Sequence, residues 1–445
     1  MSAKTKLNLF DTSMLVVSLV IGMGIFRNPV EVAKQAQTPS IFFIAWILGG
    51  IVSFCGALTY AEIGSRFPVK GGYYKIFSYC YHPAFAFMVN WMIVISNAGA
   101  TAIVAMVGAE YINPVLMPDS LQNPLGIKIT SIGTIVVLYL INYVGIRLSA
   151  QTQNLLSMIK IVLMLLLCLS VFFHQESAVS IAQESVVSLS TTDAFKALAL
   201  SFVPIFFTYG GYQNTINFGT DIENAPRNTP RGIFIGFSLV ILLYLVINYA
   251  YYKVLGFSGV QNSTSLTSDL AKVFFGETGY KVTSVLLFIS VLTFINSAML
   301  FNPRIHYAMA DDGVLPPIFK RTNERTQVQE FALTIFAVFL ILVLLFIDSF
   351  RQLLNYVMFF DSVGMVTSAA TIFILRRQAT QQPIADGGIY TIGLGKNLMP
   401  ALFIVIYFVT ALSALLSTPE NLPIALGLFA AGLPLYYIIK KVIGK

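Results

Sequence analysis

Long apolar stretches follow one another along almost the whole chain, separated by shorter polar segments. Each stretch matches the roughly 20 apolar residues that a helix needs to cross a bilayer. We therefore predict an all-α integral membrane protein with twelve transmembrane helices. These cover residues 11–36, 41–65, 84–112, 127–147, 150–173, 194–220, 231–256, 279–308, 330–348, 352–376, 398–417 and 421–440.

The composition agrees with lipid as the main solvent of this chain. Hydrophobic residues make up 56% of it and charged residues only 11%, whereas soluble domains carry about 25% charged residues. The net charge of +7 belongs to no soluble basic domain, so we exclude binding to nucleic acid. The longest predicted loops, which are too short for a soluble domain, are 66–83, 113–126, 174–193, 257–278, 309–329 and 377–397. Function must therefore lie within the helix bundle.

Metal, disulfide and catalytic chemistry find little support in the sequence. Cys55, Cys80 and Cys168 have no paired spacing, and we expect the three histidines to lie outside the apolar stretches. An enzyme within the membrane would need His, Ser or acidic groups that converge at depth. We therefore expect no metal, no cofactor and no enzymatic activity.

Positive charge predicts the orientation. With residues 1–10 as a cytoplasmic segment, roughly two-thirds of the 27 Lys and Arg residues fall on the cytoplasmic side. The first apolar stretch runs well past the length of a signal peptide, so we interpret it as a retained helix. An even number of helices then places both termini in the cytoplasm.

Two predicted helices are interrupted by glycine at matching places. The first contains Gly22 and Gly24, and the sixth contains Gly210 and Gly211 after Pro204. Each opens a block of five helices, within residues 11–173 and 194–376, and helices 11 and 12 follow within 398–441. Because five is odd, the second block starts on the opposite side of the membrane. This pattern predicts an inverted repeat whose paired breaks form a binding site near the midplane.

The breaks also suggest what binds there. Unwinding frees backbone N–H and C=O groups that cannot stay unpaired in hydrocarbon. Freed N–H groups at the start of a half-helix attract a carboxylate, and freed carbonyls accept hydrogen bonds from an ammonium group. A zwitterionic amino acid satisfies both. The alternative is that these glycines only permit close helix packing.

Several motifs in order then resemble those of the amino acid–polyamine–organocation transporters. The run from Val20 to Phe26, followed by Pro29, is similar to that family's G-S-G-I-F…P signature. Tyr60-Ala61-Glu62 in helix 2 is a further match, and Pro68, Gly71, Gly72 and Tyr73 then match the family's P-x-x-G-G-x-Y loop. The run from Phe207 to Tyr212 resembles the L-type amino acid transporter branch, and the run from Ala310 to Phe319 resembles a loop of bacterial amino acid antiporters.

The resemblance implies the leucine-transporter fold, with helices 1–10 as a 5+5 core and helices 1 and 6 discontinuous. It implies a substrate carboxylate at the N–H groups of Gly22, Met23 and Gly24. It implies a substrate ammonium at the carbonyls of Val20, Phe207 and Gly210. Phe207 would cover the substrate as an aromatic lid, with Tyr209 and Tyr212 at the same gate.

The chain departs from the family pattern at three positions. Met23 replaces a small, usually hydroxyl-bearing residue beside the carboxylate. Tyr212 stands where the L-type run has Trp, and Ile222 stands where it has a second acid. These changes affect the choice of substrate more than the mechanism.

Polar residues inside the predicted helices are further candidates, because charge at membrane depth is costly. Lys160 in helix 5 resembles a family lysine that takes the place of a sodium ion, which implies sodium-independent transport; the alternative is that it snorkels to the cytoplasmic face. Asp361 in helix 10 would contact the substrate or a proton, or else serve as a structural acid. Asn97 and Asn296 would read the substrate side chain or join helices.

Charged residues near the inner face provide a candidate gate of ion pairs, or simply solvated loop charge. They are Glu62, Arg66, Asp221, Glu223, Asp311 and Asp312.

The function predicted from these features is secondary transport of amino acids, sodium-independent and by alternating access, as an exchanger or with proton coupling. A channel fits two glycine breaks less well than a carrier does. A polyamine or other organocation transporter is the alternative within the same superfamily, but its site should hold acids in helices 3, 6 or 8. Only Glu110, at the outer end of helix 3, fits that requirement.

The resemblance also bears on partners and location. Animal L-type transporters carry a cysteine after helix 3 that links a heavy subunit, and this chain has none there. We therefore expect no disulfide-linked heavy subunit, a monomer or homodimer, and a place in the cell (inner) membrane.

Overall fold

The structure is a computed structural model that describes residues 7–68, 72–145, 158–159, 162, 165–169, 189–219, 222–346, 350–379, 390–393, 395–416 and 422–443. The described part is built from helices, and its β-structure is limited to isolated bridge pairing such as that between Leu7 and Ile222. Seven helices are long and apolar enough to cross a membrane, or eight if a bent pair counts as one span.

The helices follow the predicted apolar stretches closely. In the first half they are α1 (Leu9–Val20), α2 (Gly24–Ala36), α3 (Pro39–Arg66), α4 (Gly72–Cys80), α5 (Pro83–Leu116), η1 (Asp119–Leu121) and α6 (Pro124–Val144). In the second half they are α8 (Thr191–Tyr209), η3 (Tyr212–Asn217), α9 (Ala225–Asn262), α10 (Leu266–Asp311), η4 (Pro317–Lys320), α11 (Glu330–Phe346), α12 (Phe350–Ala379), α13 (Leu398–Leu416) and α14 (Leu422–Ile443).

Local sequence explains where several helices begin. The Asn8 side chain accepts from the Asp11 N–H while the Asp11 carboxylate accepts from the Asn8 N–H, which closes a capping box at the start of α1. Helices α3 and α6 each start with a polar cap, Thr38 or Asn123, followed by proline. Proline suits the first turn because the N–H that it lacks has no partner inside the helix.

Several predicted loops contain helix, and in two of them it is α-helix of two turns or more. The segment 66–83 includes α4, and the segment 257–278 is helical at both ends, because α9 and α10 extend into it. Gly256 and Gly276 adopt positive φ angles of 68° and 63° inside these long helices, so each marks a sharp turn where the chain leaves the apolar stretch. His306, expected outside the apolar stretches, lies in α10 and is buried.

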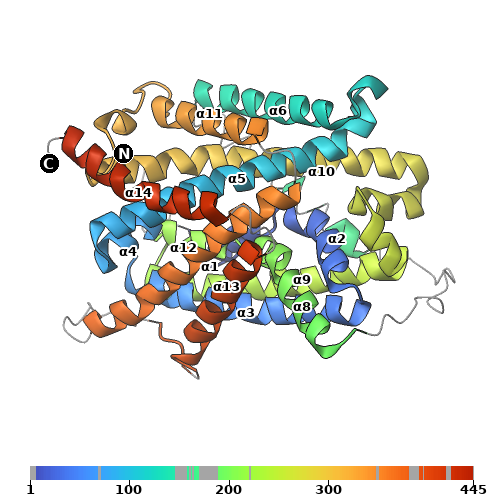
Figure 1. Cartoon of the computed structure of the whole chain (residues 1–445), viewed down its shortest axis with the longest axis horizontal. Coiled ribbons are helices and arrows are strands. Elements are labelled where there is room, and N and C mark those ends of the chain that lie inside the picture. The colour runs from blue at the N-terminus through green and yellow to red at the C-terminus, as the bar shows by residue number, and fades with distance from the viewer. Residues whose placement is uncertain are drawn as a thin grey trace.

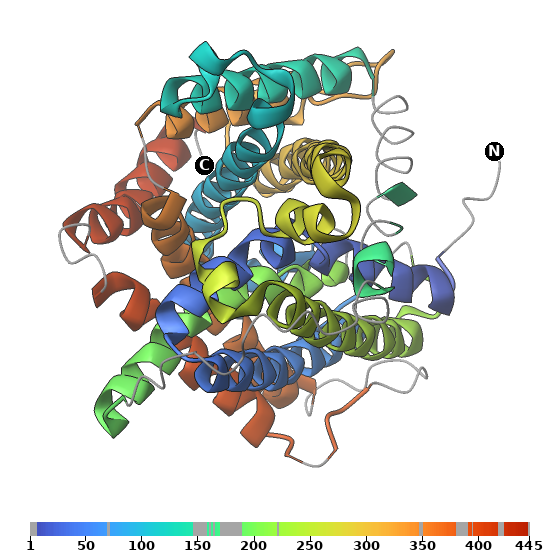
Figure 2. The ribbon, with the colours of Figure 1, turned by 90° about the vertical axis from the view of Figure 1, so that its right-hand side faces the viewer.

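The helices form two packed groups. In one group, α1 and α3 pack against α9, and α2 and α3 pack against α8. In the other, α5 packs against α10, α6 and α11. Figures 1 and 2 both show α5, α6, α10 and α11 on one side of the molecule and α3, α8 and α9 on the other. The interrupted helices lie in the first group, beside the boundary with the second.

Candidate functional site: two facing helix breaks

The first break separates α1 from α2 at the predicted glycines. The ladder of α1 ends at Val20, Ile21 takes an extended conformation, and α2 begins at Gly24 with the axis bent by 47°. In the described part of the chain, no side chain caps the first turn of α2. The Phe26 N–H donates to the Met23 carbonyl at 3.1 Å, and the N–H groups before it lie at an uncapped helix start, which favours an anion.

The second break separates α8 from η3. The last α8 residue is Tyr209, Gly210 is extended, and Gly211 has a φ of 119° that only glycine adopts easily. The Gly211 N–H donates to the Gln213 side chain at 2.8 Å. The carbonyl groups near the end of α8 therefore leave the helical hydrogen-bond pattern beside the first break.

The two breaks touch each other through their glycines. A Cβ on Gly211 would lie 2.2 Å from the Leu19 carbonyl oxygen, and a Cβ on Gly24 would lie 2.9 Å from the Thr208 Cα. The Asn28 amide adds a polar link, because it donates to the Pro204 carbonyl at 3.0 Å and to the Thr208 hydroxyl at 2.8 Å. The two interrupted helices are thus held side by side at their breaks.

Gly22 differs from Gly24 in its surroundings. A Cβ on Gly22 would come no closer than 3.8 Å, to the Phe294 ring, and Gly22 keeps accessible surface. Gly24 is buried against Thr208. A large side chain at Gly24 would therefore disturb helix packing first, so Gly22 is the better position for a test of ligand binding.

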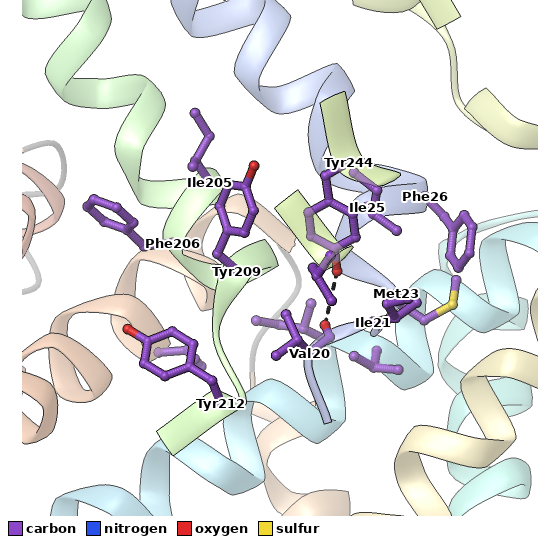
Figure 3. Packing of buried hydrophobic residues seen from close by; sticks show 14 of the residues in the cluster. Val20, Ile21, Met23, Ile25, Phe26, Ile205, Phe206, Tyr209, Tyr212 and Tyr244 are labelled. Carbon is purple, nitrogen blue, oxygen red and sulfur yellow. Dashed lines mark hydrogen bonds between the residues drawn. The ribbon is translucent and has the colours of Figure 1, made fainter. Parts of the chain in front are cut away.

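Tyr244 is a site residue that the sequence analysis missed. Its fully buried hydroxyl donates to the Val20 carbonyl at 3.0 Å and lies 3.3 Å from the Thr208 carbonyl, so it joins both breaks. Figure 3 shows this hydroxyl pointing from α9 to Val20. A buried tyrosine usually has a hydrogen-bond partner, but the sequence does not show which group it is.

The three aromatic residues predicted at the gate have different surroundings. Tyr209 is fully buried, with its ring 5.7 Å from that of Trp46, and Tyr212 is fully buried 4.9 Å from the Phe237 ring. Phe207 keeps accessible surface. Of the three, Phe207 alone is partly open in the described structure.

Asn97 and Asn296 lie in hydrogen bonds between helices. Asn97 on α5 donates to Asn302 on α10 at 3.0 Å, and Asn142 on α6 donates to Asn296 on α10 at 2.8 Å. Both pairs stay inside the second helix group. The structure therefore supports the interpretation of these amides as links between helices.

Of the two charged residues predicted at membrane depth, the structure describes Asp361 but not Lys160. Asp361 lies in α12, is only partly buried, and has no hydrogen bond or ion pair with any described residue. Lys160 lies outside the described residues, so its predicted role stays a prediction. No group of three or more metal-ligating side chains is found among the residues that were placed.

The predicted inner gate separates into a buried network and surface pairs. Glu62 is fully buried and accepts from Arg376 at 2.8 and 2.6 Å and from Arg66 at 2.8 Å. Its carboxylate also accepts from the Ile392 N–H at 3.0 Å. Glu62 therefore fastens the segment after α12 to the end of α3.

The other charges of this gate lie at the surface. Asp311 pairs with Lys320 at 2.9 Å and Asp312 pairs with Lys75. The hydrogen bond to Asp311 raises the pKa of Lys320. Glu223 is exposed, and Asp221 lies outside the described residues.

Comparisons with known proteins agree with this geometry. A family model described as amino acid permease matches residues 7–438. The serine/threonine exchanger SteT of Bacillus subtilis (strain 168) is 27% identical over 443 residues, which cover 98% of this chain and 97% of that protein. The large neutral amino acids transporter small subunit 2 of Mus musculus is 25% identical over 455 residues, covering 98% and 81%. The Asc-type amino acid transporter 1 of Mus musculus is 25% identical over 451 residues, covering 98% and 81%.

The family match includes both helix breaks and the buried network of Glu62, and it confirms the resemblance predicted from the motifs. With two facing breaks inside an apolar helix bundle, the chain belongs to the amino acid permease family of the amino acid–polyamine–organocation superfamily.

Proposed function

We propose that this protein is a sodium-independent secondary transporter of amino acids that works by alternating access, as an exchanger or with proton coupling. The observation that carries the proposal is the contact between two helix breaks, with Gly211 against Leu19 and Gly24 against Thr208. Broken helices of this kind place uncommitted backbone groups at membrane depth. The names of the relatives, an exchanger and amino acid transporters, support the same substrate class.

The substrate carboxylate would bind at the N–H groups of Gly22, Met23 and Gly24, where α2 starts without a side-chain cap. A helix start attracts negative charge because its first N–H groups point outward and the helix dipole is positive there. Met23 supplies no hydroxyl beside these groups and is itself buried.

The substrate ammonium would bind at the carbonyls of Val20, Phe207 and Gly210. Val20 already accepts from Tyr244 at 3.0 Å, and its second lone pair remains for the ammonium. Phe207, which keeps accessible surface, would close over the bound amino acid. Tyr209 and Tyr212 would support this lid from the packed aromatic cluster behind it.

The fold proposed for this mechanism has twelve transmembrane helices with a 5+5 inverted repeat. Its support is the helix order, in which every predicted helix except the fifth, largely outside the described residues, corresponds to a helix of the structure. The two packed groups are the natural moving parts, since the breaks lie in one group and Gly22 lies beside Phe294 of α10 in the other.

We also propose that the protein lies in the cell (inner) membrane. Both of its termini would then lie in the cytoplasm. The excess of Lys and Arg predicted on that side supports this orientation, and the contacts Leu7–Ile222 and Glu62–Arg376 join segments that it places on the same side. We further propose a monomer or homodimer without a disulfide-linked heavy subunit. The polyamine alternative loses its one candidate acid, because Glu110 lies 3.5 Å from Arg27.

Purified protein in liposomes preloaded with unlabelled amino acids would test the proposal. We expect saturable uptake of labelled neutral amino acids by counterflow, with the same rate when sodium is replaced by choline. Uptake that requires sodium would contradict the role proposed for Lys160. Linear, non-saturable flux without counterflow would contradict a carrier.

A further inference from the structure

Asp361 lies in the middle of the buried face of α12. Val357, Met365 and Ser368 occupy the same face one or two turns away, and all three are buried. Val363, on the opposite face, keeps accessible surface. Asp361 nevertheless keeps accessible surface, although its neighbours on this face of α12 are buried. Because lipid would lie on the other side of the helix, this surface faces an opening inside the bundle.

The neighbours of Asp361 show where this opening lies. One turn before it, the Val357 carbonyl accepts from Ser96 of α5 at 3.2 Å. One turn after it, the Met365 carbonyl accepts from Tyr60 of α3 at 3.4 Å. This face of α12 therefore spans the boundary between the two helix groups. It is the boundary on which the two helix breaks also lie.

Among the described residues, the titratable groups nearest this face of α12 are Tyr212 and Tyr60. Tyr212, the first residue after the second break, interacts with it electrostatically. Tyr60 of α3 lies 5.9 Å from Tyr212 between ring centroids, and Tyr407 of α13 also interacts with Tyr212. From α5, Ser96 faces this part of α12 and does not titrate.

No described cation neutralises Asp361. Arg376, on the same helix, lies about four turns away and is bound to Glu62. A carboxylate at membrane depth is costly unless a cation or a proton neutralises it. An acid that has contact with an internal opening, and no partner in the described structure, is positioned to exchange a proton with water that enters this opening.

We propose that Asp361 is a proton-binding site of this carrier, which couples proton movement to amino acid transport. The carboxylate takes up a proton from water when the opening faces one side of the membrane and releases it to water on the other side. Protonation removes the unpaired charge while the helix groups rearrange. This inference rests on the proposed function, because it needs an opening that alternates between the two sides.

The experiment uses the full-length protein in liposomes that contain a pH-sensitive dye, with labelled neutral amino acids outside. For the wild type, an inward-directed proton gradient should accelerate net uptake at least fivefold, and the lumen should acidify when amino acid is added. Asp361→Asn should retain counterflow exchange but lose both the acceleration and the acidification. Asp361→Glu should recover part of both, and Asp119→Asn, the same change at an exposed acid, should behave like the wild type.

The outcomes separate this proposal from the transport function itself. If the wild type shows no counterflow, the carrier proposal fails. If Asp361→Asn still couples uptake to protons, or if Lys160→Gln alone removes the coupling, Asp361 is not the proton site. If the wild type moves no protons and Asp361→Asn instead loses a preference for cationic amino acids, Asp361 binds the substrate side chain, and the proton role is overturned. Thermal stability in detergent shows whether a silent variant is folded.

Discussion

The glycines at the helix breaks allow a prediction in which packing and ligand binding are separated. Alanine at Gly211 would have to adopt a φ of 119° and would place its Cβ 2.2 Å from the Leu19 carbonyl oxygen. Backbone strain of this kind costs about 1–3 kcal/mol, and forced overpacking costs a further 1–3 kcal/mol or so. We therefore expect Gly211→Ala to lower the free energy of unfolding by about 2–6 kcal/mol.

Alanine at Gly22 should have the opposite profile. Its Cβ would meet Phe294 at an ordinary 3.8 Å, and Gly22 has no positive φ. Folding should therefore be little affected. The added methyl would narrow the space in front of the first N–H groups of α2. Loss of one hydrogen bond to a charged carboxylate costs about 1.5–3 kcal/mol, so the apparent affinity for amino acids should fall roughly 10- to 150-fold.

Thermal unfolding in detergent and concentration-dependent counterflow in liposomes would measure the two effects separately. Gly133→Ala is the matched control, because a Cβ there meets nothing within 4 Å; it should leave the affinity unchanged and raise stability by no more than about 1 kcal/mol, the usual gain of alanine over glycine inside a helix. Unchanged affinity in Gly22→Ala would refute the carboxylate site. Wild-type stability in Gly211→Ala would refute the close contact between the breaks.

Three further predictions concern polar side chains around the site. Glu62→Gln should destabilise the protein by about 3–5 kcal/mol, because it leaves buried Arg376 without its anion; the double variant with Arg376→Gln should lose less than the sum, which a double-mutant cycle would show. Tyr244→Phe should reduce thermal stability by about 1 kcal/mol and slow counterflow, since the hydroxyl holds both breaks; a stability and rate equal to the wild type would contradict that role. Asn296→Ala should lower stability by about 1 kcal/mol without changing the order of preference among amino acids, and a changed order in the uptake panel would place Asn296 at the substrate.

The sequence predicted the helix breaks because glycine has a specific physical meaning inside an apolar stretch. Both predicted interruptions are present, at Gly22–Gly24 and at Gly210–Gly211. The lengths of the apolar stretches predicted the helices, because a helix needs about 20 apolar residues to cross a bilayer. The helices hidden in segments 66–83 and 257–278 were missed because length alone does not separate a short surface helix from a loop.

The direction of side chains could not be predicted in this way. Tyr209 and Tyr212 flank the second break in sequence, yet both point into the packed cluster with Trp46 and Phe237. Tyr244 is remote in sequence and nevertheless joins the two breaks. Such contacts depend on the rotation of each helix about its axis, which packing against neighbours determines.

Most of the polar contacts in the core connect helices of the same group. Asn28 of α2 binds Thr208 of α8, and Asn97 of α5 binds Asn302 of α10. A rotation of one group against the other would leave these hydrogen bonds intact. The side chains that carry them therefore hold each helix group together internally.

Few ion pairs cross the boundary in the described structure, and those that do lie at opposite ends of the bundle. Arg27, just beyond the first break, lies 3.5 Å from Glu110 of α5. Glu62 of α3 binds Arg376 of α12, a helix that packs more extensively against α5 than against α3. Opening either end would have to break the pair at that end, while the other pair holds. Because Glu62 is fully buried and Glu110 is partly exposed, water can replace the partner of Glu110 more easily. The asymmetry should make the end with Arg27 the easier one to open when no substrate is bound.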